Sequence, residues 1–280
     1  MTCGTVFQGT CQSRRLANIS LYRADVKPDV NNGFVAGIDP WHPVVAFTAP
    51  GPSSSMGLYM YVGTADQPTK SLGLYKLRRY PYGVSRRYLN GSDIFECKTN
   101  VDGRSLARLS EEAATSPDFL VKYVAGFSVG IFSYFLSAQP AIYPPTSLTQ
   151  RISKLSQVCH ADQYFQSYVE MPISCHRNGR DYDLVRAATV LRPSSRLASR
   201  LGVSVTEHLL VAAFYDNISD SALCVYRLND IRQRFTENIQ TCDNSETETL
   251  LVGRQFYGGD RYCTPLQVGI KLMLVPHVWI

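Results

Sequence analysis

The 280-residue chain lacks a hydrophobic run long enough to cross a membrane. Its most apolar stretch, VKYVAGFSVGIFSYFLSAQ at 121–139, has 16 residues between Lys122 and Gln139, whereas a transmembrane helix needs about 20. Residues 1–20 also lack the apolar core of a signal peptide. We therefore expect no transmembrane span and no signal peptide within this sequence, and any targeting segment should lie before it.

Cys-x-x-Cys pairs are also absent, although the chain has eight cysteines. Cys159-His160 and Cys175-His176 are adjacent pairs, and neighbouring side chains on a strand point to opposite faces. A zinc site needs pairs of ligands two to four residues apart, so we expect no metal site, and no cofactor motif is present.

The charge pattern excludes a further class. The net charge is only +5, and the basic residues occur as scattered pairs without interleaved aromatic residues. This pattern is not that of a nucleic-acid-binding surface, and solvated strands and loops explain it better.

The cysteines that are present indicate disulfide bonds in an oxidising compartment, because they are even in number and widely spaced. Three N-glycosylation sequons agree with an extracellular setting. They begin at Asn18, Asn90 and Asn217.

The order of apolar runs predicts an all-β fold. The chain has 17 tyrosines, and short runs rich in aromatic and β-branched residues alternate with polar turns. No regular alternation of strands with long helices is present, which favours a sandwich, barrel or propeller. We expect strands at 44–48, 58–65, 72–77, 167–173, 183–191 and 209–215.

Two helices are expected. Residues 103–117 could form a short helix that ends at Pro117. Residues 228–240 are the stronger candidate, because apolar residues recur every three or four positions and Asn229 or Asp230 could cap the start. We expect this helix to pack on a β core through Leu228, Ile231, Phe235 and Ile239.

The stretch 121–139 allows two further interpretations. Gly126-Phe127-Ser128-Val129-Gly130 matches the nucleophile elbow of hydrolases, and Asp183 and His208 follow in the order of a catalytic triad. The segment after Ser128 is β-like, however, and no glycine-rich oxyanion loop precedes it. A hairpin with its turn around 126–130 and Pro140 ending the second strand accounts for the whole stretch.

Several phrases resemble the sema domain of plexins. They match in chain order, sparsely over 25–118 and densely over 119–242, and the cysteine spacing agrees. The phrases are CGTVFQGTC at 3–11, VAGF at 124–127, SYFL at 133–136, RISKL at 151–155, CHAD at 159–162, FQSYVEMPISC at 165–175, DSALC at 220–224 and RLNDI at 227–231.

This resemblance implies a fold. Plexin sema domains are seven-bladed β-propellers of antiparallel four-stranded blades, with an inserted helical extrusion that would lie near 229–263 here. We therefore expect an incomplete propeller over residues 1–265 and a divergent tail over 266–280. A partial propeller should leave a strand edge open, which the apolar end of the chain could cover or which could aggregate.

The resemblance also implies disulfide bonds Cys3–Cys11, Cys175–Cys224 and Cys242–Cys263. Closing the second loop, of about 50 residues, would stabilise the fold by about 4 kcal/mol in the chain-entropy account. Cys97 and Cys159 have no implied partner within the chain, and a Cys97–Cys159 bond is an open alternative.

The function implied is that of an extracellular, ligand-binding module of a plexin-like semaphorin receptor in cell and axon guidance, not an enzyme. Its partner would be a semaphorin, with another plexin chain as a second candidate, at the outer face of the plasma membrane. A truncated decoy without signalling and a serine hydrolase using Ser128 are the alternatives. The binding residues cannot be assigned from the sequence, although one aromatic–arginine cluster has the composition of a hot spot or of a plain polar loop. It comprises Tyr80, Tyr82, Arg86, Arg87 and Tyr88.

Overall fold

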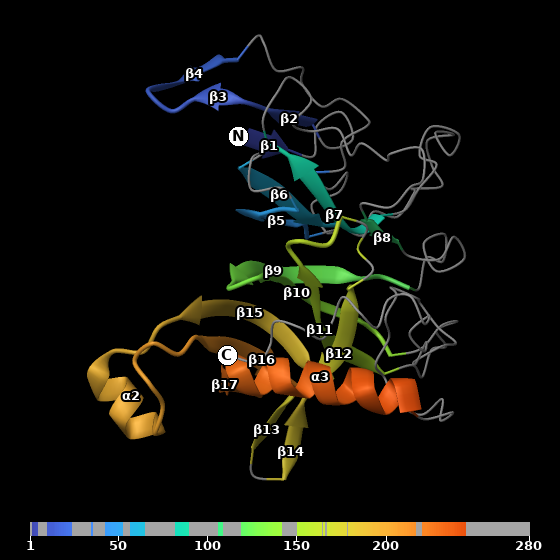
Figure 1. Ribbon diagram of the computed structural model, residues 1–280, viewed down its shortest axis with the longest axis vertical. Coiled ribbons are helices and arrows are strands. Elements are labelled where there is room, and N and C mark those ends of the chain that lie inside the picture. Colours follow the sequence, from blue (N-terminus) through green and yellow to red (C-terminus); the bar gives the residue numbers. More distant parts are fainter. Residues whose placement is uncertain are drawn as a thin grey trace.

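The computed structural model shows a stack of antiparallel β-sheets that follow one another along the long axis of the molecule (Figure 1). The two four-stranded sheets and the three-stranded sheet are called the upper, middle and lower sheets, in their order down Figure 1. The structure describes residues 2–4, 10–23, 35, 43–52, 57–64, 82–89, 106–108, 119–141, 150–163, 165, 167–177, 179–216 and 220–244.

The upper sheet runs in chain order through β5 (Val45–Pro50), β6 (Leu58–Gly63), β7 (Tyr82–Tyr88) and β8 (Leu106–Arg108). The strands expected at 44–48 and 58–65 are confirmed as β5 and β6. The helix expected over 103–117 is wrong at β8, which pairs with β7 as an edge strand. Pairing with a distant strand overrides the local helical pattern there.

The middle sheet has the same order, with β9 (Lys122–Val129), β10 (Phe132–Pro140), β11 (Arg151–Cys159) and β12 (Val169–Ile173). Its hairpin confirms the hairpin interpretation of 121–139, but the turn is tighter and later than expected. Only Gly130 and Ile131 separate the strands, and Gly130 has φ +63°, a conformation that glycine adopts without strain. Gly126 lies inside β9, opposite Phe135.

The lower sheet consists of β15 (Leu184–Leu191), β16 (Leu209–Tyr215) and β17 (Ser221–Arg227). Between β15 and β16 lies α2 (Ser195–Leu201), a helix that the sequence analysis did not expect. The described residues also form three two-stranded ribbons. They are β1–β2 (Thr2–Gly4, Thr10–Gln12), β3–β4 (Arg14–Arg15, Asn18–Tyr22) and β13–β14 (Cys175–Arg177, Arg180–Tyr182).

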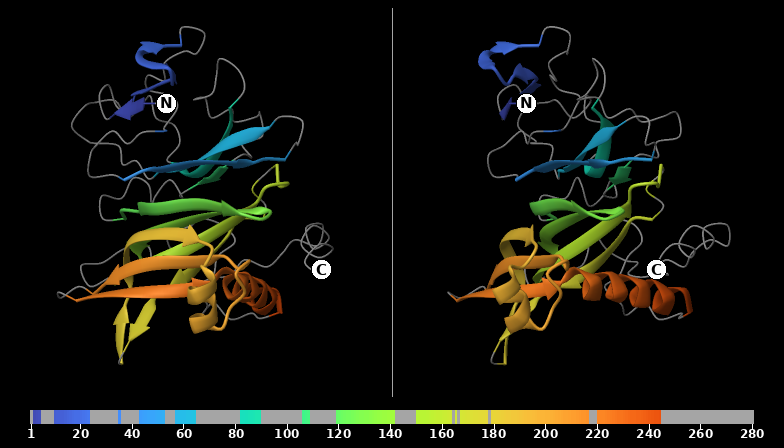
Figure 2. Two further views of the ribbon diagram at one scale, coloured as in Figure 1. Left: turned by 90° about the vertical axis from the view of Figure 1, so that its left-hand side faces the viewer. Right: turned by 60° about the vertical axis from the view of Figure 1, so that its left-hand side comes forward.

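The expected helix at 228–240 is confirmed as α3 (Leu228–Asn244), which lies alongside the lower sheet (Figure 2). Leu228, Ile231 and Phe235 are buried, as the spacing predicted. The helix follows β17 directly, so Asn229 and Asp230 lie in its first turn and neither residue precedes it as a cap.

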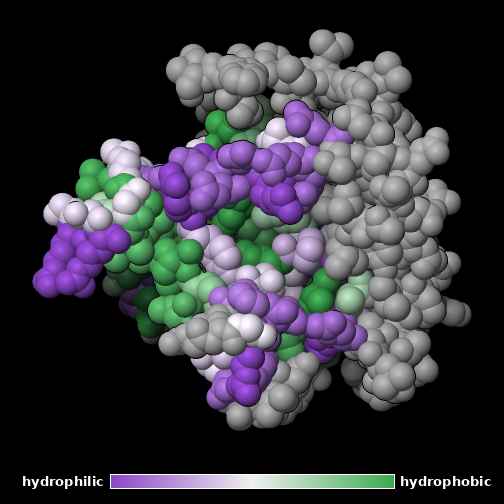
Figure 3. Space-filling view, turned by 90° about the horizontal axis from the view of Figure 1, so that it is seen from below, coloured by the Kyte–Doolittle hydropathy of each residue, from purple (hydrophilic) through white to green (hydrophobic). Residues whose placement is uncertain are grey.

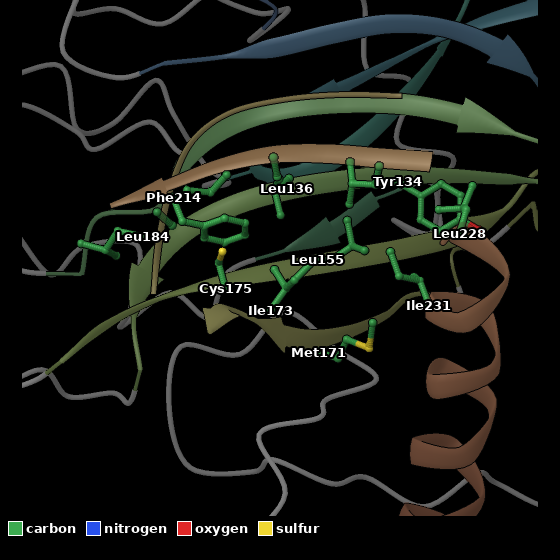
Figure 4. Packing of buried hydrophobic residues seen from close by; sticks show 14 of the residues in the cluster. Tyr134, Leu136, Leu155, Met171, Ile173, Cys175, Leu184, Phe214, Leu228 and Ile231 are labelled. Atoms are coloured by element: carbon green, nitrogen blue, oxygen red, sulfur yellow. The ribbon is translucent and has the colours of Figure 1, made fainter. Parts of the chain in front are cut away.

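Two of the hydrophobic clusters among the described residues lie between the three sheets. One lies between the upper and middle sheets and includes Tyr61, Val121 and Phe135. The other lies between the middle and lower sheets and is sealed by α3; Figure 4 shows its side chains pointing toward one another. Sheets of antiparallel strands in chain order, packed face to face, are the blades of a β-propeller.

The lower sheet is the incomplete blade of the described part. β17 pairs with β16 on one side, and no strand that the structure describes pairs with its other side. The open edge expected of a partial propeller stays a prediction, because the outer strands of the other sheets also pair on one side only and the apolar end of the chain, 266–280, lies outside the described residues, as does the rest of the expected extrusion beyond Asn244.

Candidate functional site

The first disulfide bond, Cys3–Cys11, joins β1 to β2, where the two cysteines are directly opposite in the strand register. It is one of the pairs that the resemblance implied. Next to it, the Arg14 guanidinium donates to the side chains of Thr2 and Gln12 at 3.0 and 2.8 Å. These contacts fix the first two ribbons to one another.

The second disulfide bond, Cys175–Cys224, attaches the β13–β14 ribbon to β17 and is also an implied pair. Two polar contacts reinforce it: the Tyr226 hydroxyl donates to the Ser174 carbonyl at 2.7 Å, and Arg180 pairs with Asp220 at 2.5 Å. The ribbon, which projects at the bottom of Figure 1, is thereby held against the edge strand of the lower sheet.

The remaining cysteine predictions have different outcomes. Cys159 has a free thiol, so a Cys97–Cys159 bond is wrong for this structure. Burial raises the pKa of the Cys159 thiol. Cys97 and Cys263 lie outside the described residues, and the structure does not describe the side chain of Cys242, so that pair stays a prediction.

Asn18 is the one sequon asparagine among the described residues. It is exposed at the start of β4, and its side-chain oxygen accepts a hydrogen bond from the Ser20 backbone N–H at 3.0 Å. An exposed hairpin is a suitable place for a glycan. Asn90 and Asn217 lie outside the described residues, and glycosylation of all three stays a prediction.

The hydrolase triad is not assembled. Ser128 lies within β9 and not at a strand-to-helix turn. Its hydroxyl is 3.1 Å from His160 Nε2, whereas Asp183 accepts a hydrogen bond from Gln150 and His208 accepts one from Arg192. The elbow interpretation is therefore wrong, because the strand continues through Ser128 and the three proposed partners lie apart.

His160 instead ties the β9–β10 hairpin to the end of β11. Its Nε2 also lies 3.1 Å from the Ser133 hydroxyl, and its backbone N–H donates to the Ile131 carbonyl at 2.8 Å. Burial, with a smaller effect of the Arg86 charge, lowers the pKa of His160 to about 4. A neutral imidazole that hydrogen-bonds to two serine hydroxyls of the hairpin has a structural role here.

The aromatic–arginine cluster proves to be largely interior. Arg86 and Arg87 are 6% and 2% exposed, because β7 is covered on both faces. Neither the hot-spot nor the polar-loop interpretation holds for them. Tyr88 is half-buried, Tyr80 lies outside the described residues, and the side chain of Tyr82 is not described.

Arg86 connects two sheets. Its guanidinium donates to the carbonyls of Asp162 and Gln163 at 2.8 and 3.2 Å and lies 5.1 Å from the centre of the Phe165 ring. Tyr59 and Tyr61 flank it at 5.5 and 5.7 Å. The sequence analysis predicted no strand at 82–88, and the burial of Arg86 depends on residues that are distant from it in sequence.

The described residues show no sign of a metal site or of a membrane-spanning helix. No group of three or more His, Cys, Asp or Glu side chains there is arranged to hold a metal ion. In the same part of the chain, no helix has the length and apolar character needed to cross a membrane.

Comparisons with known proteins agree with the resemblance found in the sequence. The family model described as "Sema domain" matches residues 185–268. Mouse Plexin-A4 is 38% identical over 148 residues, which cover 49% of this chain and 8% of that protein. Human Plexin-A4 is 29% identical over 262 residues, which cover 88% of this chain and 13% of that protein.

A solved structure of the full extracellular region of plexin A4 superimposes with a TM-score of 0.68 and 26% identity, over 94% of this chain and 31% of that one. The resemblance to plexin sema domains is thus confirmed, and the described sheets have the fold of a sema-type β-propeller. The chain corresponds to a small part of the length of these curated relatives.

Proposed function

We propose that the chain is a semaphorin-binding module from the extracellular region of a plexin-like guidance receptor. The observation that carries this proposal is the superposition of 94% of the chain on the plexin A4 extracellular region. The two disulfide bonds lie at the positions that the resemblance to plexin sema domains implied, which supports this proposal. They also fit an oxidising, extracellular setting.

The binding surface should lie on loops and strand edges around the sheets. Large β-scaffolds carry their recognition residues on such segments, and a standard protein interface buries on the order of 1,600 Å². The buried cluster around Arg86 is unsuited to this, because its guanidinium already binds carbonyls of the chain. The role is binding and not catalysis, and a second plexin chain is a further candidate partner.

The direct test uses the chain secreted from animal cells and a panel of immobilised semaphorin ectodomains. A folded preparation, defined by cooperative thermal unfolding and by peptide mapping of both bonds, should bind at least one semaphorin saturably. The matched control is the reduced chain, which should lose this binding. A folded, correctly bonded chain that binds no member of the panel would contradict the proposal.

The decoy alternative concerns what is attached to this module in the cell. Added to semaphorin-responsive cells, the isolated chain should compete with the cellular receptor and reduce the response in proportion to its concentration. The hydrolase alternative predicts ester turnover that Ser128→Ala abolishes, and we expect no turnover from either form.

A further inference from the structure

The loop between β15 and β16 carries an exposed row of arginines. We define the α2 loop as residues 192–206, which contain Arg192, Arg196 and Arg200 and no Asp or Glu. All three arginines are exposed. Arg196 and Arg200 are four residues apart on one helix, so they project from the same side about 6 Å apart along its axis.

The α2 loop is a fixed projection. Ser194 caps α2 by accepting a hydrogen bond from the Leu197 N–H, and Gly202 ends it in the left-handed conformation with φ 64°. Ala198 anchors the helix as its buried residue, and the Val203 N–H donates to the Ala198 carbonyl at 3.0 Å. Its backbone is therefore ordered before any ligand arrives, which lowers the entropic cost of binding.

Arginines elsewhere in the described chain are mostly occupied. Arg151 and Arg232 donate to backbone carbonyls, and Arg180 and Arg227 pair with carboxylates. Among the described residues, by contrast, Arg196 and Arg200 have neither a hydrogen-bond nor an ion-pair partner. Arg192 donates only through its Nε, to His208. The α2 loop thus presents guanidinium groups whose donors are available to a ligand.

At the base of the α2 loop, the neighbouring carboxylate is already paired and does not neutralise the arginine row. Glu207, which follows it, is 8% exposed and pairs with Arg227 at 3.3 Å. Burial lowers the pKa of His208, and the charges of Arg192 and Arg232 lower it further. The paired Glu207 and the smaller contribution of the two arginine charges to the lowered pKa of His208 are consistent with a positive potential around the arginine row.

Apolar side chains on the loop do not require a protein partner. Leu197, Leu201 and Val205 are 38%, 44% and 50% exposed, so none of them lies fully in solvent. Figure 3 shows hydrophobic and strongly hydrophilic side chains beside one another on this projecting side of the molecule. Partly exposed apolar side chains of this kind are common on surfaces, whereas the row of three exposed arginines, two of them without a partner among the described residues, is the distinctive feature.

We infer that the α2 loop binds a linear sulfated polyanion, the chemistry of an extracellular glycosaminoglycan chain. An extended chain with regularly spaced sulfates can follow the row, and each guanidinium offers several donors to one anionic group. Ser195 and Ser199, which are also exposed, add hydroxyl donors along the helix. The site would hold the module on a cell-surface polysaccharide independently of a protein ligand.

Heparin oligosaccharides immobilised on a sensor surface test this inference with the full chain. The informative variant is Arg196→Gln/Arg200→Gln, and the matched control is Arg15→Gln/Arg234→Gln, which removes the same charge from two exposed sites elsewhere. Binding is measured from 50 to 300 mM NaCl, and thermal unfolding of each variant verifies its fold. Desulfated heparin and vesicles with anionic lipid serve as competing probes.

We expect the α2 variant to lose at least tenfold in affinity at 150 mM NaCl and its salt slope to fall by about two, while the control stays within twofold of the unsubstituted chain. Desulfated heparin should bind weakly. The inference is overturned if the unsubstituted chain does not bind heparin, if both double variants lose affinity equally, or if desulfated heparin or anionic vesicles bind as well as heparin.

Discussion

The middle and lower sheets are built in the same way and covered differently. Both are antiparallel meanders in chain order, but every residue of the inner strands β10 and β11 is buried or half-buried, whereas exposed residues alternate along the outer strand β17. Leu223 and Val225 of β17 are 69% and 45% exposed. The middle sheet lies between two neighbours, and the lower sheet has a neighbour among the described residues on one face only.

The comparison indicates that a blade of this fold buries apolar side chains mainly against the sheets on either side of it. Strand pairing alone gives the lower sheet its hydrogen bonds but leaves apolar side chains in water. The Cys175–Cys224 bond attaches the β13–β14 ribbon to the lower sheet, and α3 packs against the cluster between the middle and lower sheets.

The largest effect should come from the Cys175–Cys224 bond. Replacing both cysteines by Ala removes a link across 49 residues, and the chain-entropy account gives a loss of about 4 kcal/mol in the free energy of unfolding. Urea denaturation measures it. The Cys3→Ala/Cys11→Ala variant, with a separation of 8, should lose less; an equal loss would contradict the special dependence of the lower sheet on its link.

Leu155→Ala tests the covered middle sheet. Leu155 is fully buried between the middle and lower sheets, so its truncation should cost about 3.5 kcal/mol from lost burial and the cavity left behind. Leu223→Ala on the open face is the matched control and should change stability by less than about 0.5 kcal/mol. Similar losses from the two substitutions would mean that β17 is covered in solution.

A third effect concerns pH. His160 has a pKa of about 4 in the folded chain, against 6.5 for an ordinary histidine. The unfolded chain therefore binds more protons between these values, so the stability from neutral His160 is complete above about pH 6.5 and is lost as the pH falls through 4. The loss should approach about 3 kcal/mol.

Denaturant titrations at pH 7, 6, 5 and 4 measure this dependence against His160→Gln, which should remove up to one proton from the slope in that window. Carboxylates titrate in both proteins and cancel in the comparison. Parallel curves for the two proteins would show that His160 is not held neutral by the middle sheet.

How far the sequence predicted these features depended on the range of the interactions. β16 and the buried face of α3 follow from local patterns, and both were predicted closely. The missed helix α2 had local signals too, because Ser194 and Gly202 stand at the two positions that favour a cap. The burial of Arg86 had none, since it arises from the loop after β11, which lies 76 residues away in the chain.

The smallest of these stability losses should come from Gly126→Ala, which tests the contact between the upper and middle sheets. Gly126 lies in β9 where the middle sheet meets β5 of the upper sheet, and an added Cβ would approach the Phe47 ring to 2.5 Å. Because the ring is packed against Tyr61 and Phe135, it can shift only partly, and we expect a loss of about 2 kcal/mol.

Phe47→Leu in the same chain supplies the control for that substitution. If the close approach of the two sheets causes the loss, the double variant should lose less than the sum of the two single losses, by about 1 kcal/mol in a double-mutant cycle. Additive losses would show that Gly126 is required by β9 alone. The contact between covered sheets would then matter less than their own pairing, contrary to the comparison of the middle and lower sheets.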